Sequence, residues 1–159
     1  MLDIELCGLS LKSPLILASG ILGVSYSTMK RAYDAGLGAV TTKSIGKKVR
    51  IGYDNPSIVE VYPGTFINSV GLGNPGIDNF THELKTLKEL KIPTIVSVFG
   101  KTNDEYIEVA TKAENSGADA IEINISCPHA KVSSIGASKD LTFELVSELK
   151  QHISVPLFI

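Results

Sequence analysis

Short, continuous apolar runs alternate along the chain with longer stretches in which apolar residues recur every three or four positions. The short runs predict strands that are buried on both faces of a parallel sheet, and the longer stretches predict amphipathic helices. Strands are predicted at 15–18, 39–42, 94–98, from 120 onward, and at 157–159. Helices are predicted from a cap at Ser27, from Ile77, from a Thr102–Glu105 capping box, and from a cap at Asp140.

Two further segments read as antiparallel hairpins, one at 4–12 and one at 58–67 with its turn at Pro63-Gly64. The rest of the order is strand and helix repeated four times, followed by a fifth strand. This order predicts an α/β fold and the first half of a (β/α)8 TIM barrel, with strands 1–5, helices 1–4 and an N-terminal hairpin in one domain at 1–159. A flavodoxin-like sheet also has five strand–helix steps and is the competing fold.

Composition narrows the class of protein. The 159 residues carry a net charge of −2, which gives no electrostatic basis for binding nucleic acid. No run approaches the roughly 18 apolar residues of a membrane span, and the acidic start lacks the layout of a signal peptide. Cys7 and Cys127 are the only cysteines, so a disulfide scaffold is not expected, and Cys7 is expected to be a packing residue. We therefore expect a cytoplasmic protein without nucleic-acid or membrane partners.

Polar residues follow four of the predicted strands. They are Ser19-Gly20, Lys43-Ser44, Ser97 with Gly100, and Asn124 with Ser126 and Cys127. In a barrel these strand ends converge on one mouth, and the glycines would let a large planar ligand approach the backbone. Serine, asparagine and glycine are also common turn formers, which explains any single strand end. Lys43 distinguishes best between a ligand site and ordinary turns, because a lysine at the end of a buried strand needs an anionic or carbonyl partner.

Cys127 has three possible roles: an inert buried thiol, a metal ligand, or an acid–base catalyst. The remaining candidate ligands, Cys7, His82, His129 and His152, do not have the spacing of a zinc site, so no metal is expected. A thiol with a reference pKa near 8.5 can transfer protons near neutrality. Composition leaves catalysis and packing open.

Four motifs in order resemble the class 1 dihydroorotate dehydrogenases, and most closely the NAD-linked 1B subtype. They are LASG at 17–20, TKS at 42–44, NSVGLGNPG at 68–76 and EINISCP at 122–128. The resemblance implies an FMN-binding barrel that oxidises dihydroorotate to orotate in de novo pyrimidine (UMP) biosynthesis. It implies FMN contacts at Ser19, Gly20, Lys43, Ser44, Ser97 and Asn124. It implies substrate contacts at Lys43, Asn68, Ser69, Val70, Gly71, Leu72 and Asn124. Cys127 would be the base that removes the proton from carbon 5.

The resemblance also implies an electron-transfer subunit with an iron–sulfur cluster and FAD, in a homodimer or heterotetramer. One feature departs from the family pattern, because His129 follows Cys-Pro where the family often has asparagine. Cys-Pro-His also occurs in dihydropyrimidine dehydrogenases, which act on uracil and thymine and form the first alternative. The second is a truncated, non-catalytic half-barrel, because family members continue beyond the position of Ile159.

Overall fold

The computed structural model describes residues 2–126 and 133–159. Five strands form one parallel sheet: β3 (Ile16–Leu17), β4 (Ala39–Thr41), β7 (Thr94–Val98), β8 (Ala120–Ile123) and β9 (Leu157–Phe158). Their order across the sheet, β3-β4-β7-β8-β9, is also their order along the chain. A flavodoxin-like sheet has the order 2-1-3-4-5, whereas a barrel adds each strand beside the previous one. The observed order therefore has the topology of half a TIM barrel and excludes the competing fold.

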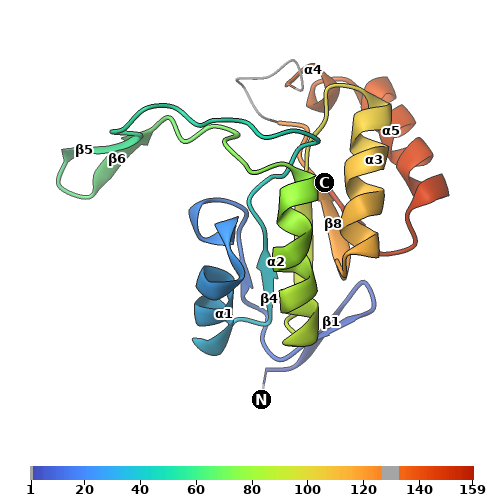
Figure 1. Ribbon diagram of the computed structural model, residues 1–159, viewed down its shortest axis with the longest axis horizontal. Helices are drawn as coiled ribbons and strands as arrows, with labels where there is room; N and C mark the ends of the chain where they lie inside the picture. Colours follow the sequence, from blue (N-terminus) through green and yellow to red (C-terminus); the bar gives the residue numbers. More distant parts are fainter. Residues whose placement is uncertain (1, 127–132) are drawn as a thin grey trace.

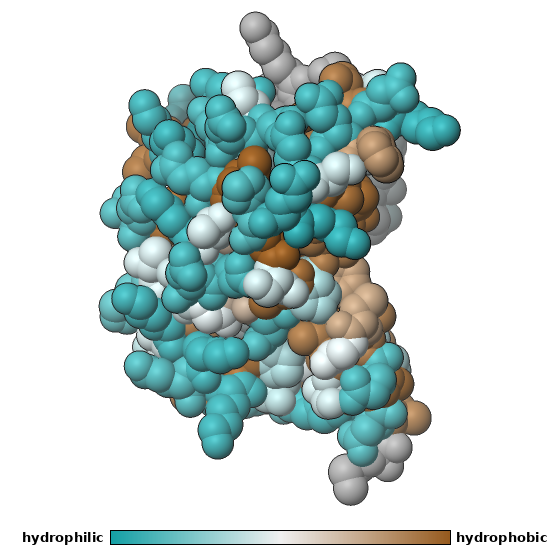
Figure 2. All heavy atoms as spheres, turned by 90° about the vertical axis from the view of Figure 1, so that its right-hand side faces the viewer, coloured by the Kyte–Doolittle hydropathy of each residue, from teal (hydrophilic) through white to brown (hydrophobic). Residues whose placement is uncertain are grey.

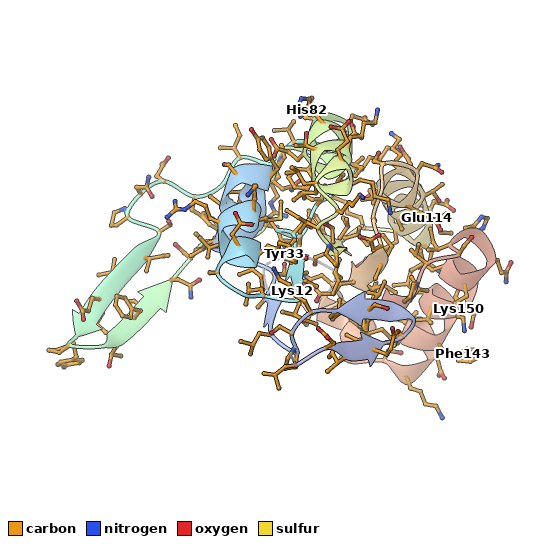
Figure 3. All side chains as sticks on the ribbon, turned by 90° about the horizontal axis from the view of Figure 1, so that it is seen from below. Lys12, Tyr33, His82, Glu114, Phe143 and Lys150 are labelled. Carbon is orange, nitrogen blue, oxygen red and sulfur yellow. The ribbon has the colours of Figure 1, made fainter. Side chains whose placement is uncertain are left out.

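Four helices cover one face of this sheet. They are α1 (Tyr26–Asp34), α2 (Ile77–Glu89), α3 (Asn103–Asn115) and α5 (Lys139–His152). Consecutive helices pack against each other, and Figure 3 shows them as an arc around the strands. Two short helical segments that the sequence pattern did not predict lie at Ile21–Val24 (η1) and Ser133–Gly136 (α4). Figure 2, which looks onto the side that carries α5, shows a mostly hydrophilic surface, with hydrophobic side chains gathered toward one margin.

The core lies between the sheet and the helices. Strand residues that face the helices are fully or almost fully buried: Val40, Val96, Val98, Ile121 and Ile123. Helix residues pack against them: Phe80, Leu84, Tyr106, Val109, Leu145 and Leu149. Successive residues of a strand point to opposite faces, and Ser97 pairs in register with Glu122. Ser97 and Glu122 therefore share the face that is turned away from the helices.

Helix starts differ from two of the predicted caps. The predicted cap at Ser27 is wrong, because Ser25 is the N-cap of α1 and its side chain accepts from Thr28 N–H. The predicted cap at Asp140 is also wrong, because Ser138 caps α5. Each true cap has extended backbone, as capping requires, whereas Ser27 and Asp140 already lie in the first helical turn. Thr102 caps α3 as predicted, by accepting from Glu105 N–H.

Both predicted hairpins are present. The first joins β1 (Ile4–Leu6) and β2 (Leu9–Leu11) through Cys7 and Gly8, both of which have positive φ. This turn points Cys7 into solvent, so the expectation that Cys7 packs in the interior is wrong. The ammonium of Lys12, just after β2, lies 3.4 Å from the ring centre of Tyr33 on α1 (Figure 3).

The second hairpin joins β5 (Ile58–Tyr62) and β6 (Thr65–Asn68). It extends from the body of the molecule as an arm, visible at the left of Figure 1, and both of its strands are exposed throughout. Its inner end leads through residues 69–76 back to α2, so the arm lies next to the glycine-rich motif. The arm thus places Asn68 and Ser69 beside the ends of the sheet strands.

Candidate functional site

A cavity of about 800 Å³ opens at the carboxyl ends of the sheet strands, a volume typical of ligand sites. Residues from the ends of β3, β4 and β8, the glycine-rich segment, α4 and the end of β9 line it. They are Ser19, Gly20, Lys43, Ser44, Asn68, Ser69, Gly71, Leu72, Glu122, Ile123, Asn124, Ile125, Ser126, Gly136 and Ile159. The predicted convergence of separate strand ends and the glycine-rich motif on one space is therefore present.

Most of the predicted site residues line this cavity, and two described ones do not. Ser97 is completely buried behind Ser44, and Val70 is half-buried between the lining residues Ser69 and Gly71. Contact of Ser97 and Val70 with a ligand stays a prediction. Cys127 lies outside the described residues, and Ser126, directly before it in the sequence, lines the cavity.

The hydroxyl of Ser44 is the centre of the polar network in the cavity wall. It accepts a hydrogen bond from Asn124 Nδ2 at 2.9 Å and lies 3.0 Å from the Ser97 hydroxyl and 3.4 Å from the Ser19 hydroxyl. A hydroxyl has one hydrogen to donate and two lone pairs to accept with, so these three contacts use its full capacity. Ser44 thereby links the ends of three strands and fixes where Ser19 and Asn124 lie on the cavity wall.

Lys43 has the carbonyl partner that its burial requires. The residue is 9% exposed, and its ammonium donates to the backbone oxygen of Gly71 at 2.6 Å. Its backbone N–H donates to Gly23 O at 2.8 Å, across an approach so close that a Cβ on Gly23 would lie 2.3 Å from that nitrogen. Gly23 is a residue that the sequence reasoning missed, because no local pattern marks this contact with η1.

Asn74 fastens the glycine-rich segment to the loop that follows β4. Its side-chain oxygen accepts from the N–H groups of Gly46 and Gly76, and its side-chain nitrogen donates to Leu72 O. Its backbone N–H and C=O also exchange hydrogen bonds with Arg50, both at 2.9 Å. Asn74 is itself 7% exposed, so these bonds replace water around a buried amide. The sequence motif contained Asn74 without indicating this role.

Glu122 is a further residue of the cavity wall to which the sequence reasoning gave no role. It lies on β8, two residues before Asn124, and is half-buried on the face turned away from the helices. The strand alternation could have indicated it, because residues 122 and 124 share a face. The cavity thus combines hydroxyl, amide, ammonium and carboxylate groups.

An ion-pair network lies outside the cavity wall, next to Gly46. Glu108 on α3 pairs with Lys47 at 2.6 Å and with Lys112 at 3.2 Å, and Lys112 also pairs with Asp78 on α2 at 2.7 Å. The hydrogen bond from Lys47, and then that from Lys112, hold the pKa of Glu108 below its ordinary value. The bonds to Glu108 and to Asp78 raise the pKa values of Lys47 and Lys112, respectively. These exposed pairs connect the loop after β4 to α3 and α2.

Within the described part of the chain, no group of three or more His, Cys, Asp and Glu side chains is arranged to hold a metal ion. Among the same residues, no helix has the length and apolar character needed to cross a membrane.

Comparison with known proteins identifies the family. The model of the dihydroorotate dehydrogenase family matches residues 1–159. The chain belongs to this family. Similar curated proteins include the dihydroorotate dehydrogenase B (NAD(+)) catalytic subunits of Thermoplasma volcanium, 46% identical over 155 residues, and Methanocaldococcus jannaschii, 43% identical over 164 residues. The matches cover 96% and 99% of this chain but 51% and 53% of those proteins, respectively. The chain therefore spans about half the length of the curated relatives that it matches.

A solved structure supports the fold independently. The crystal structure of the Eimeria tenella dihydroorotate dehydrogenase, in complex with ferulenol, superposes with a TM-score of 0.82 at 21% identity. The match covers 95% of this chain and 43% of that one. The sheet and helices of this family member thus have the same arrangement as part of that solved structure.

Proposed function

We propose that this chain contributes its cavity to the oxidation of dihydroorotate to orotate, with FMN as hydride acceptor, in de novo pyrimidine biosynthesis. The observation that carries the proposal is that the polar ends of β3, β4 and β8 and the glycine-rich segment line one cavity of about 800 Å³ in a member of the dihydroorotate dehydrogenase family. No observation favours the dihydropyrimidine dehydrogenase alternative over this one.

The cavity suits a flavin by its donor set. Flavin rings present carbonyl oxygens and ring nitrogens, which need N–H and O–H donors around their edge. Ser19, Lys43 and Asn124 supply hydroxyl, ammonium and amide groups from neighbouring strand ends, and Ser44 fixes the positions of Ser19 and Asn124. At Gly20 (φ 153°) nothing lies within 4 Å of the position that a Cβ would occupy, so the backbone there is open to a planar ligand. When bound, FMN would accept the hydride from carbon 6 of dihydroorotate.

Dihydroorotate is a small carboxylate, and the segment from Asn68 to Leu72 has the means to hold it. Asn68, Ser69, Gly71 and Leu72 line the cavity, and Val70 lies between them. The ammonium of Lys43 reaches this segment at Gly71 O, which supports the proposal that its positive charge acts on the substrate. A buried ammonium stabilises negative charge that develops in a transition state far better than an exposed one does.

The reaction breaks two C–H bonds, so it needs a base for the proton on carbon 5 as well as an acceptor for the hydride. We assign the base to Cys127, whose thiol has an ordinary pKa near 8.5. The support is its place in the sequence directly after Ser126, a residue of the cavity wall.

Electrons taken from the substrate must leave the flavin again. The relatives are named as the catalytic subunits of a NAD(+)-linked enzyme. By analogy, we propose an electron-transfer partner subunit with an iron–sulfur cluster and FAD. We also propose that the assembly is a homodimer or a heterotetramer and that it acts in the cytoplasm.

The test is flavin reduction in the protein at the full length of its natural polypeptide. After incubation with FMN and gel filtration, the protein should show flavin absorbance, and anaerobic dihydroorotate should bleach it. The matched substrate is dihydrouracil, which lacks the carboxylate and should react more slowly. Cys127→Ser should retain FMN but reduce it more slowly, because the base is removed and the flavin cradle is kept.

Two results would contradict the proposal. A soluble, folded protein that takes up no FMN would exclude the flavin site. Faster bleaching by dihydrouracil than by dihydroorotate would instead indicate a dihydropyrimidine dehydrogenase that acts on uracil and thymine. Unchanged bleaching by Cys127→Ser would remove only the role given to that thiol.

A further inference from the structure

We propose that Tyr106 is a positioning residue that holds Asn124 in place for the reaction, although Tyr106 lies behind the cavity wall. The inference rests on the proposed function, because it concerns the geometry of Asn124 toward flavin and substrate. Tyr106 is completely buried on α3, and its hydroxyl donates to the backbone oxygen of Asn124 at 2.8 Å. Its neighbours on the buried face of α3 are Val109, Ala110 and Ala113, which have no side-chain polar group.

The hydrogen bond from Tyr106 lies at the point where the backbone hydrogen bonds between β7 and β8 end. Asn124 N–H still donates to Val98 O at 2.9 Å, which is the last rung between β8 and β7. In a parallel ladder the C=O of the same residue points to the same neighbouring strand, and its donor would be the N–H of residue 100. The strand β7 ends at Val98, and between these two described residues no hydrogen bond runs from Gly100 N–H to Asn124 O. The tyrosine hydroxyl therefore replaces a backbone N–H as the donor to Asn124 O.

Gly100 makes room for this arrangement. A Cβ on Gly100 would lie 2.8 Å from the backbone nitrogen of Tyr106 and 3.0 Å from its ring. Real Cβ contacts of this length do not occur, so only glycine at position 100 allows α3 to bring the ring beneath the end of β8. Gly100 and Tyr106 are thus both needed for the hydrogen bond from the Tyr106 hydroxyl to Asn124 O.

Asn124 is consequently held through its backbone and through its side chain. Tyr106 fixes its backbone carbonyl, and Ser44 accepts from its side-chain nitrogen at 2.9 Å. The side-chain oxygen accepts from Ser126 N–H, which orders the segment that follows. Removal of the Tyr106 hydroxyl leaves the ring in the core but releases the carbonyl, so the backbone that carries the amide can shift although the bonds to Ser44 and Ser126 remain. A misplacement of about 1 Å in a reacting constellation can cost on the order of 100-fold in rate.

The experiment compares anaerobic, stopped-flow flavin reduction by dihydroorotate in the full-length protein and three variants. Tyr106→Phe removes the hydroxyl, and Gly100→Ala reaches the same contact by displacing the ring. Val109→Ala is the matched control, because it shortens another fully buried side chain of α3 and has no bond to Asn124. FMN affinity is measured by fluorescence titration and stability by thermal unfolding.

We expect Tyr106→Phe and Gly100→Ala to lower the reduction rate at saturating dihydroorotate by about tenfold or more, with FMN affinity changed less than about twofold. Val109→Ala should lower the unfolding temperature and leave the reduction rate unchanged. Equal rates for Tyr106→Phe and the unmodified protein would overturn the inference, as would an equal loss of rate in Val109→Ala. If the unmodified protein itself is not reduced by dihydroorotate, the proposed function fails instead.

Discussion

Replacement of Asn74 by alanine tests how the substrate segment is held. The side chain makes three hydrogen bonds: it accepts from Gly46 N–H at 3.1 Å and Gly76 N–H at 2.9 Å, and donates to Leu72 O at 2.9 Å. Alanine removes all three and leaves buried backbone groups without partners, because the site is closed to water. The loop after β4 would then lose its side-chain link to the glycine-rich segment, while the two backbone bonds between residue 74 and Arg50 remain.

The magnitude follows from the number of bonds. A hydrogen bond contributes about 0.5–1.5 kcal/mol net, so three contribute about 3 kcal/mol to the free energy of unfolding. That loss is a large fraction of the 5–15 kcal/mol that stabilises a typical domain. For a chain of 150–250 residues, 1 kcal/mol shifts the unfolding temperature by about 2–4 °C. Asn74→Ala should therefore lower it by roughly 6–12 °C.

The assay is thermal and urea unfolding followed by circular dichroism, with Asn79→Ala as the matched control. Asn79 is exposed in the first turn of α2 and makes one side-chain hydrogen bond, to Pro75 O. Alanine is a better helix former than asparagine, which offsets the loss of that bond and leaves little net change. An unfolding temperature of Asn74→Ala within about 2 °C of that of Asn79→Ala would refute the reasoning that Asn74 clamps the two loops.

Two further predictions concern the cavity wall and its surroundings. Ser44→Ala should lower stability by about 1–3 kcal/mol and weaken FMN binding in a fluorescence titration, because Ser97 and Asn124 lose their shared partner; unchanged affinity would contradict the central role of Ser44. Glu108→Gln tests the ion-pair network by thermal unfolding from pH 7 to pH 3. The pKa of Glu108 is lowered in the folded state, so its contribution exists above the ordinary carboxyl pKa and is lost as pH falls through the lowered value. The small, salt-screened stability difference between the two proteins should therefore close at low pH, and a difference that persists there would exclude this origin.

The strands were predictable because their signal is local. Apolar runs such as 94–98 are buried on both faces, and polar residues directly after them in the sequence must lie at the carboxyl edge of a parallel sheet. The position of Lys43 also followed from sequence, since a buried ammonium needs a partner, and Gly71 O is that partner. The order of the strands did not follow, because barrel and flavodoxin-like sheets have the same local pattern.

Features that depend on contacts distant in sequence were missed. Tyr106 and Asn124 are separated by 18 positions, and Asn74 and Gly46 by 28, so neither hydrogen bond leaves a periodic signal. A tyrosine on an otherwise apolar helix face does indicate that its hydroxyl needs a buried partner, but not which one. The predicted caps lie two residues after the true caps, Ser25 and Ser138, because a second residue of a type that favours capping follows each. Only the backbone conformation selects between the two candidates.

The sheet order has a consequence for how the molecule forms. Each strand of the five-stranded sheet pairs with the preceding strand of that sheet, and each of the four covering helices packs on the one before it. A chain that emerges from the ribosome amino end first can therefore add each strand–helix unit to an edge that already exists. In the flavodoxin-like order 2-1-3-4-5, by contrast, the third strand pairs with the first and not with the second, so growth has to change to the other edge. Growth by addition at one edge keeps the loops that must close during assembly short.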